Sequence, residues 1–239
     1  AAGAVLLWLL RAYPSVWWLL AWALGVIVTL VLGFVAPVLL APIFFRFKPL
    51  QDAALRARFE ALAARARVPV FGVFEMGASA KTRRSNAAVM GFGRTRRIVV
   101  TDTMLHAYTA DEIESVLAHE LGHQRYRDPL VGVAVGAVLS LVMWTVGGLA
   151  YAATYPAFGI SSLGDMAGIP FLLVWCGIVS SALGPLELGW SRQREARADR
   201  FSLETAGNAR AFASAMVRLH DQNLSIANPR TWEKWLLYS

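Results

Sequence analysis

Long uncharged stretches alternate with basic segments along this chain. Three stretches carry no charged side chain at all: residues 12–45, 130–164 and 167–186. A helix needs about 20 apolar residues to cross the hydrocarbon core of a bilayer, and each stretch is long enough. Tryptophans also gather near the start of the first stretch, at Trp17 and Trp18, as anchors at a membrane interface do. The pattern therefore predicts a mainly α-helical protein that spans a membrane several times.

The first ten residues are apolar but too short to span. A signal peptide fits them poorly, because the segment has neither an initiator Met nor a basic start. We interpret them as the tail of a further membrane helix that turns back at residues 11–14. On this interpretation residues 1–45 hold the tail of one helix and one full span, and the chain is part of a longer protein.

The basic residues predict the orientation. All of the 23 Lys and Arg residues except Arg11 lie within residues 46–127 or 192–234. By the positive-inside rule both regions face the cytoplasm, so residues 130–190 form a transmembrane helical hairpin. On this interpretation the net charge of +7 comes from the cytoplasmic regions, which lie beside the head groups of the lipid bilayer. Nothing in the sequence resembles a base-reading element, so we expect no nucleic-acid partner.

Residues 46–129 are polar enough to fold outside the membrane, and their pattern predicts a small cytoplasmic α/β unit. Residues 50–67 have the spacing of an amphipathic helix. Three segments rich in β-branched or small apolar residues are predicted strands: residues 68–74, 87–90 and 97–101.

A metal-binding motif ends this unit. His119-Glu120-Leu121-Gly122-His123 has the H-E-x-x-H pattern, and residues four apart share a helix face, so both imidazoles can hold one metal ion. Glu120 is placed to act as the general base on a water molecule. Gly122 costs helix stability but lets another element approach closely. The motif predicts hydrolysis of peptide bonds.

A two-histidine site needs a third protein ligand and an open position for water. Glu195 is the best candidate, within the predicted cytoplasmic helices of residues 191–239. Asp199 lies four residues later on the same face and can fix the tautomer of a ligand imidazole. An arginine-rich surface helix with two ordinary acids is the alternative, and the upstream motif outweighs it. His106 and His220 are weaker candidates, since such residues are more often surface or capping groups.

Several segments together resemble a known family. They are residues 41–50 (APIFFRFKPL), 81–93, 116–123 (VLAHELGH), 195–199 (EARAD) and 219–225 (LHDQNLS). The chain resembles the Ste24-type CAAX prenyl proteases, integral-membrane zinc metalloproteases of the M48 class, over nearly its whole length. The metal elements fit the M48 class in general, whereas residues 47–50 and 219–225 point to the Ste24 branch.

The resemblance implies a gluzincin-like unit that holds one Zn²⁺ per chain. It implies cleavage of C-terminal tripeptides from prenylated CAAX proteins or other membrane-associated polypeptides. The substrate is expected to lie against the edge strand formed by Asn86, Ala87, Ala88, Val89 and Met90. We expect a bacterial inner membrane, or the endoplasmic reticulum membrane in a eukaryote.

The chain departs from the family in two places. The family typically has seven membrane helices around a chamber, and a His-Pro-Pro element that would follow Ser239; we expect both parts to be missing here. Two alternatives stay open: an HtpX-like protease of membrane-protein quality control, and a non-proteolytic scaffold with a structural zinc. A structural zinc site would not need Glu120, which favours an enzyme.

Overall fold

The computed structural model describes residues 2–35, 41–79, 85–91 and 93–222. The chain divides into two compact units. The first, which we call the apolar unit, consists of residues 1–32 and 130–189. The second, which we call the sheet unit, consists of residues 33–129 and 190–239.

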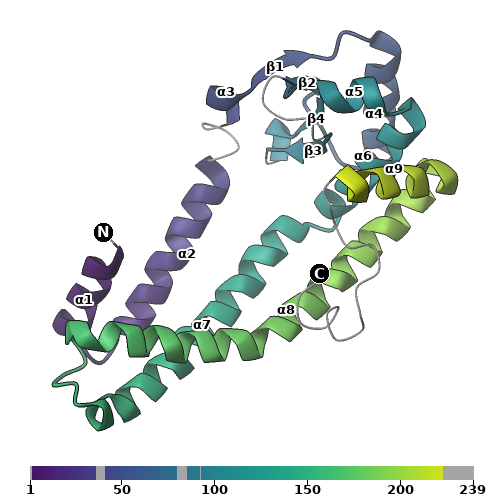
Figure 1. Ribbon diagram of the computed structural model, residues 1–239. Helices are drawn as coiled ribbons and strands as arrows, with labels where there is room; N and C mark the ends of the chain where they lie inside the picture. Colours follow the sequence, from purple (N-terminus) through teal and green to yellow (C-terminus); the bar gives the residue numbers. More distant parts are fainter. Residues whose placement is uncertain (1, 36–40, 80–84, 92, 223–239) are drawn as a thin grey trace. The chain divides into compact units, whose positions relative to one another are not determined.

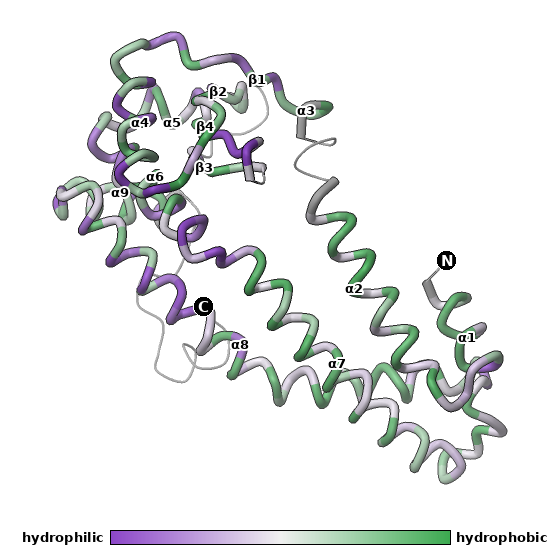
Figure 2. Tube along the Cα trace, turned by 180° about the vertical axis from the view of Figure 1, so that it is seen from behind, coloured by the Kyte–Doolittle hydropathy of each residue, from purple (hydrophilic) through white to green (hydrophobic). Residues whose placement is uncertain are grey.

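The apolar unit is built from helices. They are α1 (Ala2–Ala12), α2 (Trp17–Val35), α7 (Asp128–Thr154) and α8 (Ile169–Ala206), with the 3₁₀ turns η3 (Tyr155–Phe158) and η4 (Met166–Gly168) between the last two. Helices α7 and α8 also contribute residues to the sheet unit. Figure 2 shows that α2 and most of α7 are hydrophobic, whereas α8 changes from hydrophobic to hydrophilic along its length. Helix α8 continues through Pro185 without a break.

Two helical segments are long and apolar enough to cross a bilayer, Asp128–Phe158 and Met166–Ala206. Only 6% and 17% of their most apolar windows are buried inside the protein. A core helix of a soluble protein would be covered on most sides, so these surfaces favour contact with lipid. The first predicted stretch, residues 12–45, contains the shorter apolar helix α2, and residues 36–40 lie outside the described residues.

Small residues let α7 and α8 pack closely within the apolar unit. A side-chain carbon on Gly147 would lie 2.9 Å from Sγ of Cys176, so only glycine fits at that position. The Tyr151 hydroxyl is buried beside this contact and donates to the carbonyl of Leu163 at 3.2 Å. Residues of α7 and α8 share one buried cluster with Leu9, Leu10 and Trp17 of α1 and α2.

The sheet unit contains one four-stranded sheet. Its strands are β1 (Arg46–Pro49), β2 (Val73–Gly77), β3 (Ala87–Met90) and β4 (Arg97–Thr101), in the order β1-β2-β4-β3. Strands β2 and β4 are parallel, and the two edge strands are antiparallel to their neighbours. The unit's helices are α3 (Ala41–Phe44), α4 (Ala53–Arg65), α5 (Asp102–Ala107), α6 (Ala110–Arg125) and α9 (Ala209–Gln222), with the 3₁₀ turn η2 (Gly93–Thr95).

The core of the sheet unit forms around α6. Leu117 and Leu121 of α6 are fully buried, in one cluster with Phe59 of α4, Ile98 of β4 and Ala215 of α9. Figure 1 shows α4, α5, α6 and α9 gathered around the sheet. Because α6 is held by the sheet and by two helices, polar groups on its remaining side have fixed positions.

Most predicted elements of this unit are present, and one predicted strand has the wrong bounds. The amphipathic helix forms as α4, and the strands at residues 87–90 and 97–101 form as β3 and β4. The strand predicted at residues 68–74 begins only at Val73. Arg67 adopts a left-handed conformation, and the N–H of Val68 still donates to the carbonyl of Ala63 in α4 at 3.0 Å, so the start of this stretch leaves a helix. Contact with the β4 backbone begins at Phe71, whose N–H donates to the carbonyl of Arg96 at 2.6 Å.

Strand β1 was missed. Its sequence, Arg-Phe-Lys-Pro, has no apolar run, and three of its four residues are exposed. It forms because β2 offers an edge, and the ammonium of Lys48 pairs with the Glu75 carboxylate on β2 at 2.9 Å.

Candidate metal centre

Helix α6 begins with a capping box formed by Thr109 and Glu112. The Thr109 hydroxyl accepts from the N–H of Glu112, and the Glu112 carboxylate accepts from the N–H of Thr109 at 2.8 Å. This capping box satisfies N–H groups at the helix start. One side of α6 is buried in the core, and both His119 and His123 are half-buried outside it.

Three donor atoms converge beside α6. The Nε2 atoms of His119 and His123 lie 3.1 Å apart. Oε2 of Glu195, from α8, lies 3.4 Å from the first and 3.6 Å from the second. Ligands bound tetrahedrally to zinc at about 2.0–2.1 Å stand about 3.3 Å from one another. The three groups therefore fit a single small metal ion, as the sequence predicted.

Each imidazole also contacts a carboxylate through its other nitrogen. Nδ1 of His119 lies 2.9 Å from Oδ1 of Asp199, the contact expected from the spacing of Glu195 and Asp199. Nδ1 of His123 lies 2.8 Å from Oδ2 of Asp128. A carboxylate on Nδ1 fixes the tautomer that leaves Nε2 free to bind a metal. The contact at His123 is a hydrogen bond, and the Asp199 carboxylate lies at a similar distance from His119.

Asp128 is a site residue that the sequence reasoning did not find. It lies five residues after His123, a spacing that does not place two side chains together on one helix. It reaches the ring because α6 ends at Arg125 and α7 begins at Asp128 itself. The available signal was weak: an isolated acid at the start of an uncharged stretch.

The approach of α8 to α6 depends on Gly122. A side-chain carbon there would lie 3.4 Å from Cα of Ala198 and 3.2 Å from the ring of Phe201. The Ser202 hydroxyl donates to the carbonyl of Ser115 at 2.7 Å, a second and buried contact between the two helices. This close packing, expected from the glycine in the motif, brings Glu195 to the histidines.

Burial and charge act in opposite directions on the titrating groups. Burial lowers the pKa of His119, but hydrogen bonds to the Asp199 and Glu195 carboxylates outweigh it and raise the pKa to about 9. For His123 the carboxylates of Glu195 and Asp128 likewise overcome burial and raise the pKa. Burial raises the pKa of Glu120, and the nearby histidines offset part of that effect. A raised carboxyl pKa suits a group that must take up a proton.

Comparison with known proteins agrees with this geometry. A family model described as Peptidase family M48 matches residues 49–237. The chain belongs to this family. This M48 chain is 32% identical over 229 residues to the uncharacterized metalloprotease YhfN of Bacillus subtilis (strain 168), covering 94% of the chain and 54% of that protein.

Other relatives of this M48 chain carry more specific names. It is 32% identical over 213 residues to the CAAX prenyl protease 1 homolog of Arabidopsis thaliana, covering 87% of the chain and 49% of that protein. The crystal structure of S. mikatae Ste24p has the same fold, with a TM-score of 0.81 at 23% identity, over 99% of the chain and 59% of that structure. The chain spans about half the length of the curated relatives it matches.

His106 of this M48 chain does not contribute to the metal centre. His106, on α5, is exposed, and its Nδ1 lies 2.6 Å from the carbonyl of Asp102 in the same helix. Among the described residues, His119, His123 and Glu195 are the one group of three that could hold a metal. The side chain of His220 lies outside the described residues.

The expected substrate strand lies beside the metal helix. β3 is an edge strand of the sheet and packs on α6. The Gln124 side-chain amide, one residue after His123, donates to the carbonyl of Val89 at 3.4 Å. Asn86, just before the strand, exchanges hydrogen bonds with Thr101 through its N–H and its carbonyl. The edge that faces away from β4 therefore lies near the metal ligands.

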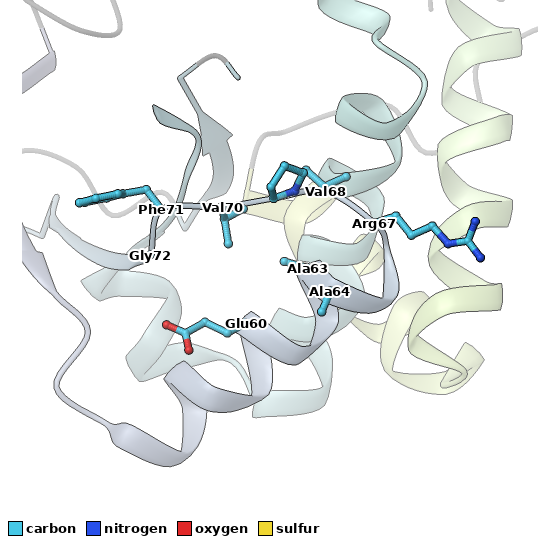
Figure 3. Close-up of a pocket in the computed structure, with 9 residues that line it drawn as sticks. Glu60, Ala63, Ala64, Arg67, Val68, Val70, Phe71 and Gly72 are labelled. Atoms are coloured by element: carbon cyan, nitrogen blue, oxygen red, sulfur yellow. The ribbon is translucent and has the colours of Figure 1, made fainter. Parts of the chain in front are cut away.

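A separate pocket of this M48 chain has no metal-binding chemistry. It has a volume of about 540 Å³ and lies where α4 connects to β2 (Figure 3). Its walls are mostly apolar, Glu60 is its one acid, and the Arg67 side chain points away from the others. The pocket contains none of the residues that surround the two imidazoles.

Proposed function

We propose that this chain is the catalytic part of a zinc-dependent endopeptidase of the membrane. Its substrates are polypeptides, and CAAX-type cleavage of C-terminal tripeptides from prenylated or membrane-associated chains is the activity it fits best. One observation carries the proposal: two imidazole nitrogens and one carboxylate oxygen converge within 3.6 Å, with Glu120 on the same helix. The names of several relatives, CAAX prenyl protease 1 among them, support the substrate class.

His119, His123 and Glu195 would hold one Zn²⁺, because two neutral imidazoles and a carboxylate are the donors of many catalytic zinc sites. When bound there, zinc supplies a Lewis acid that makes an attacking water more acidic and stabilises negative charge on the scissile carbonyl. Asp199 keeps the His119 ring in the orientation that presents Nε2.

Glu120 is the proposed general base. Its carboxylate takes the proton from the water as the water attacks the carbonyl carbon, and then gives that proton to the leaving amine. Burial beside the metal ligands raises its pKa, which brings its proton affinity closer to that of the groups it serves. A scaffold with a structural zinc would have no use for this carboxylate.

The backbone of β3 gives the register in which a substrate strand would add. The N–H of Thr101 donates to the carbonyl of Asn86, so the pair Asn86 and Thr101 is hydrogen-bonded across the sheet. In an antiparallel ladder such pairs alternate with pairs that are not bonded. Ala87 and Val89 therefore point their N–H and C=O groups away from β4. An extended peptide could pair with Ala87 and with the N–H of Val89 as an added strand, beside the Gln124 amide that donates to the Val89 carbonyl.

We also propose that the sheet unit faces the cytoplasm, in a bacterial inner membrane or in the endoplasmic reticulum membrane of a eukaryote. The distribution of basic residues supports this orientation. In a Cys176→Ser background, a cysteine at Ser162 should react with an impermeant reagent added outside cells, and one at Ser79 should not. The reverse labelling would place the metal centre outside the cytoplasm.

The activity can be tested with two matched peptides. The purified protein in lipid nanodiscs is incubated with a farnesylated CAAX peptide and with the same peptide lacking the lipid, and the products are mapped by mass spectrometry. Removal of the C-terminal tripeptide that stops on adding a zinc chelator supports the proposal. Equal cleavage of both peptides would favour an HtpX-like quality-control role. A zinc-loaded protein that cleaves neither peptide would contradict the proposal.

A further inference from the structure

Asp128 is a buried carboxylate at the metal centre. Its side chain is 3% exposed, and both of its oxygens are used. Oδ2 lies 2.8 Å from Nδ1 of His123, and Oδ1 accepts from the guanidinium of Arg197 on α8. A carboxylate withdrawn from water this far is costly unless it is fully paired, and here each oxygen has a partner.

The backbone before Asp128 is bent in an unfavourable way. Tyr126 caps the C-terminal end of α6, and Arg127 adopts a left-handed conformation with φ of 57°. Glycine usually occupies such a position, because a side chain there is strained. The turn carries Asp128 back toward His123, which a continuing helix would not do. A strained residue beside a functional group suggests that the position of that group matters.

Arg197 completes the arrangement from the other helix. Its guanidinium lies over the ring of Tyr126, 4.3 Å from the centroid, and binds Asp128. Residues 195–199 of α8 thus act on both imidazoles. Glu195 faces the two Nε2 atoms, Asp199 contacts Nδ1 of His119, and Arg197 reaches His123 through Asp128.

We propose that Asp128, held by Arg197, is a positioning residue that directs Nε2 of His123 toward the metal. It would do for His123 what Asp199 does for His119, by accepting the Nδ1 proton and fixing the ring. The inference rests on the proposed metal site. The competing explanation is purely structural: an acid at the start of α7 and its ion pair with Arg197 stabilise the fold.

Zinc affinity separates the two explanations. The variants are Asp128→Ala and Asp128→Asn, with Glu114→Gln as control. Like Asp128, Glu114 is a buried acid paired with arginine. It lies on α6 and pairs with Arg58 and Arg65, but it contacts neither imidazole. For each purified protein, competition with a chromophoric chelator gives the zinc dissociation constant. Thermal unfolding of the metal-free form gives stability, and the visible spectrum of the cobalt form reports the ligand geometry.

A positioning role predicts a specific pattern. Asp128→Ala should weaken zinc binding about 10–100-fold and alter the cobalt spectrum. Asp128→Asn should lose less, because an amide oxygen can still accept the Nδ1 proton. Glu114→Gln should lower the unfolding temperature but leave the zinc affinity of the folded protein unchanged.

Other outcomes overturn it. Parent-like zinc affinity and cobalt spectrum in both Asp128 variants, with only stability reduced, would show that Asp128 is structural, while the proposed metal site would survive. If Asp128→Ala does not fold, Asp128→Asn decides alone, and parent-like affinity together with an unchanged spectrum would refute the role. A parent protein that binds no zinc would refute the proposed function itself.

Discussion

Gly122 of α6 and Ala198 of α8 lie so close that a side-chain carbon on the glycine would be 3.4 Å from the Cα of the alanine. Ala198 is fully buried in this contact. Ala198 lies between Glu195 and Asp199 in the sequence of α8. The distance between α6 and α8 at this point therefore sets how far the carboxylates of Glu195 and Asp199 lie from the imidazoles. The metal centre therefore depends on a residue that has no side chain.

Replacing Gly122 with a larger residue should disturb the metal centre more as the new side chain becomes larger. Gly122→Ala needs a small shift of the Phe201 ring, 3.2 Å away, and gains about 1 kcal/mol of helix propensity, so stability should change little. Gly122→Val adds branches against backbone, with an overpacking cost of about 1–3 kcal/mol, and should lower zinc occupancy. Denaturant unfolding and metal analysis measure both effects. Full zinc occupancy in the valine variant would contradict this view of the helix contact.

Glu120→Gln should retain zinc and lose turnover. Glutamine has nearly the same shape but cannot accept the proton, and a general base contributes about 10²–10⁴-fold to the rate. The measurement is kcat for peptide cleavage at verified zinc content. Glu60→Gln, an exposed change on α4, is the control and should behave like the parent. A Glu120 variant of normal activity would remove the residue from the mechanism.

Glu195→Ala and Asp199→Ala should differ in severity. The first removes a proposed ligand and should leave the purified protein without stoichiometric zinc. The second removes a partner of His119 and should weaken zinc binding about 10–100-fold. Metal analysis and chelator competition give the two values. If the Glu195 variant kept all its zinc, another residue would have to be the third ligand, and His106 and His220 would return as candidates.

The raised pKa of His119 predicts opposite pH trends with and without metal. Its folded pKa is about 9, against an ordinary value of about 6.5. In the metal-free protein the protonated ring therefore stabilises the fold fully below pH 6.5, and this contribution is lost as the pH rises through 9. Zinc binds only the neutral ring, so zinc affinity should rise over the same range.

Unfolding temperatures in excess chelator and zinc affinities, both taken from pH 6.5 to 9, test this prediction. Asp199→Asn should flatten both curves, because it removes the strongest of the interactions that raise the pKa of His119. Metal-free stability that rises with pH across this window, and does so equally in the variant, would disagree with the assigned ion pair.

Proline substitutions should distinguish the residues of β3 whose N–H groups bond to β4 from those whose N–H groups point away from the sheet. Ala88 is hydrogen-bonded to β4, so Ala88→Pro removes a ladder bond and should destabilise the sheet. Ala87 points its N–H outward, where proline is tolerated on an edge strand, so Ala87→Pro should fold and raise KM for an extended peptide. Unfolding temperature and peptide kinetics give both results. An unchanged KM in the Ala87 variant would argue against strand addition at β3.

How much the sequence could predict depends on how local each feature is. The shared face of His119 and His123 and the shared face of Glu195 and Asp199 both follow from spacing within one helix. Asp128 did not, because its contact with His123 needs a tight turn through the left-handed Arg127, which no periodicity reveals. These contacts are geometric findings, and the roles assigned to the residues stay predictions.

The sheet shows the same limit. The apolar run of β4 was sufficient to predict a strand. Strand β1 has only four residues, three of them exposed, so its own sequence does not predict a strand, and it is recognised only from its pairing with β2. The run at residues 68–74 was misjudged because hydrophobicity alone cannot tell a strand from a buried connection. Val68 is indeed buried, but in a segment that has just left α4.

The separation of the metal ligands along the chain has a consequence for biosynthesis. Residues 124–194 lie between His123 and Glu195, and most of them form the apolar unit. A ribosome makes the histidine-bearing helix first, and the carboxylates that complete the site emerge only after the whole helical hairpin has been made. The nascent chain therefore carries an incomplete candidate metal centre while the residues between the two ligand helices are being made. The proposed hydrolase therefore gains its activity only once residues 195–199 have been made.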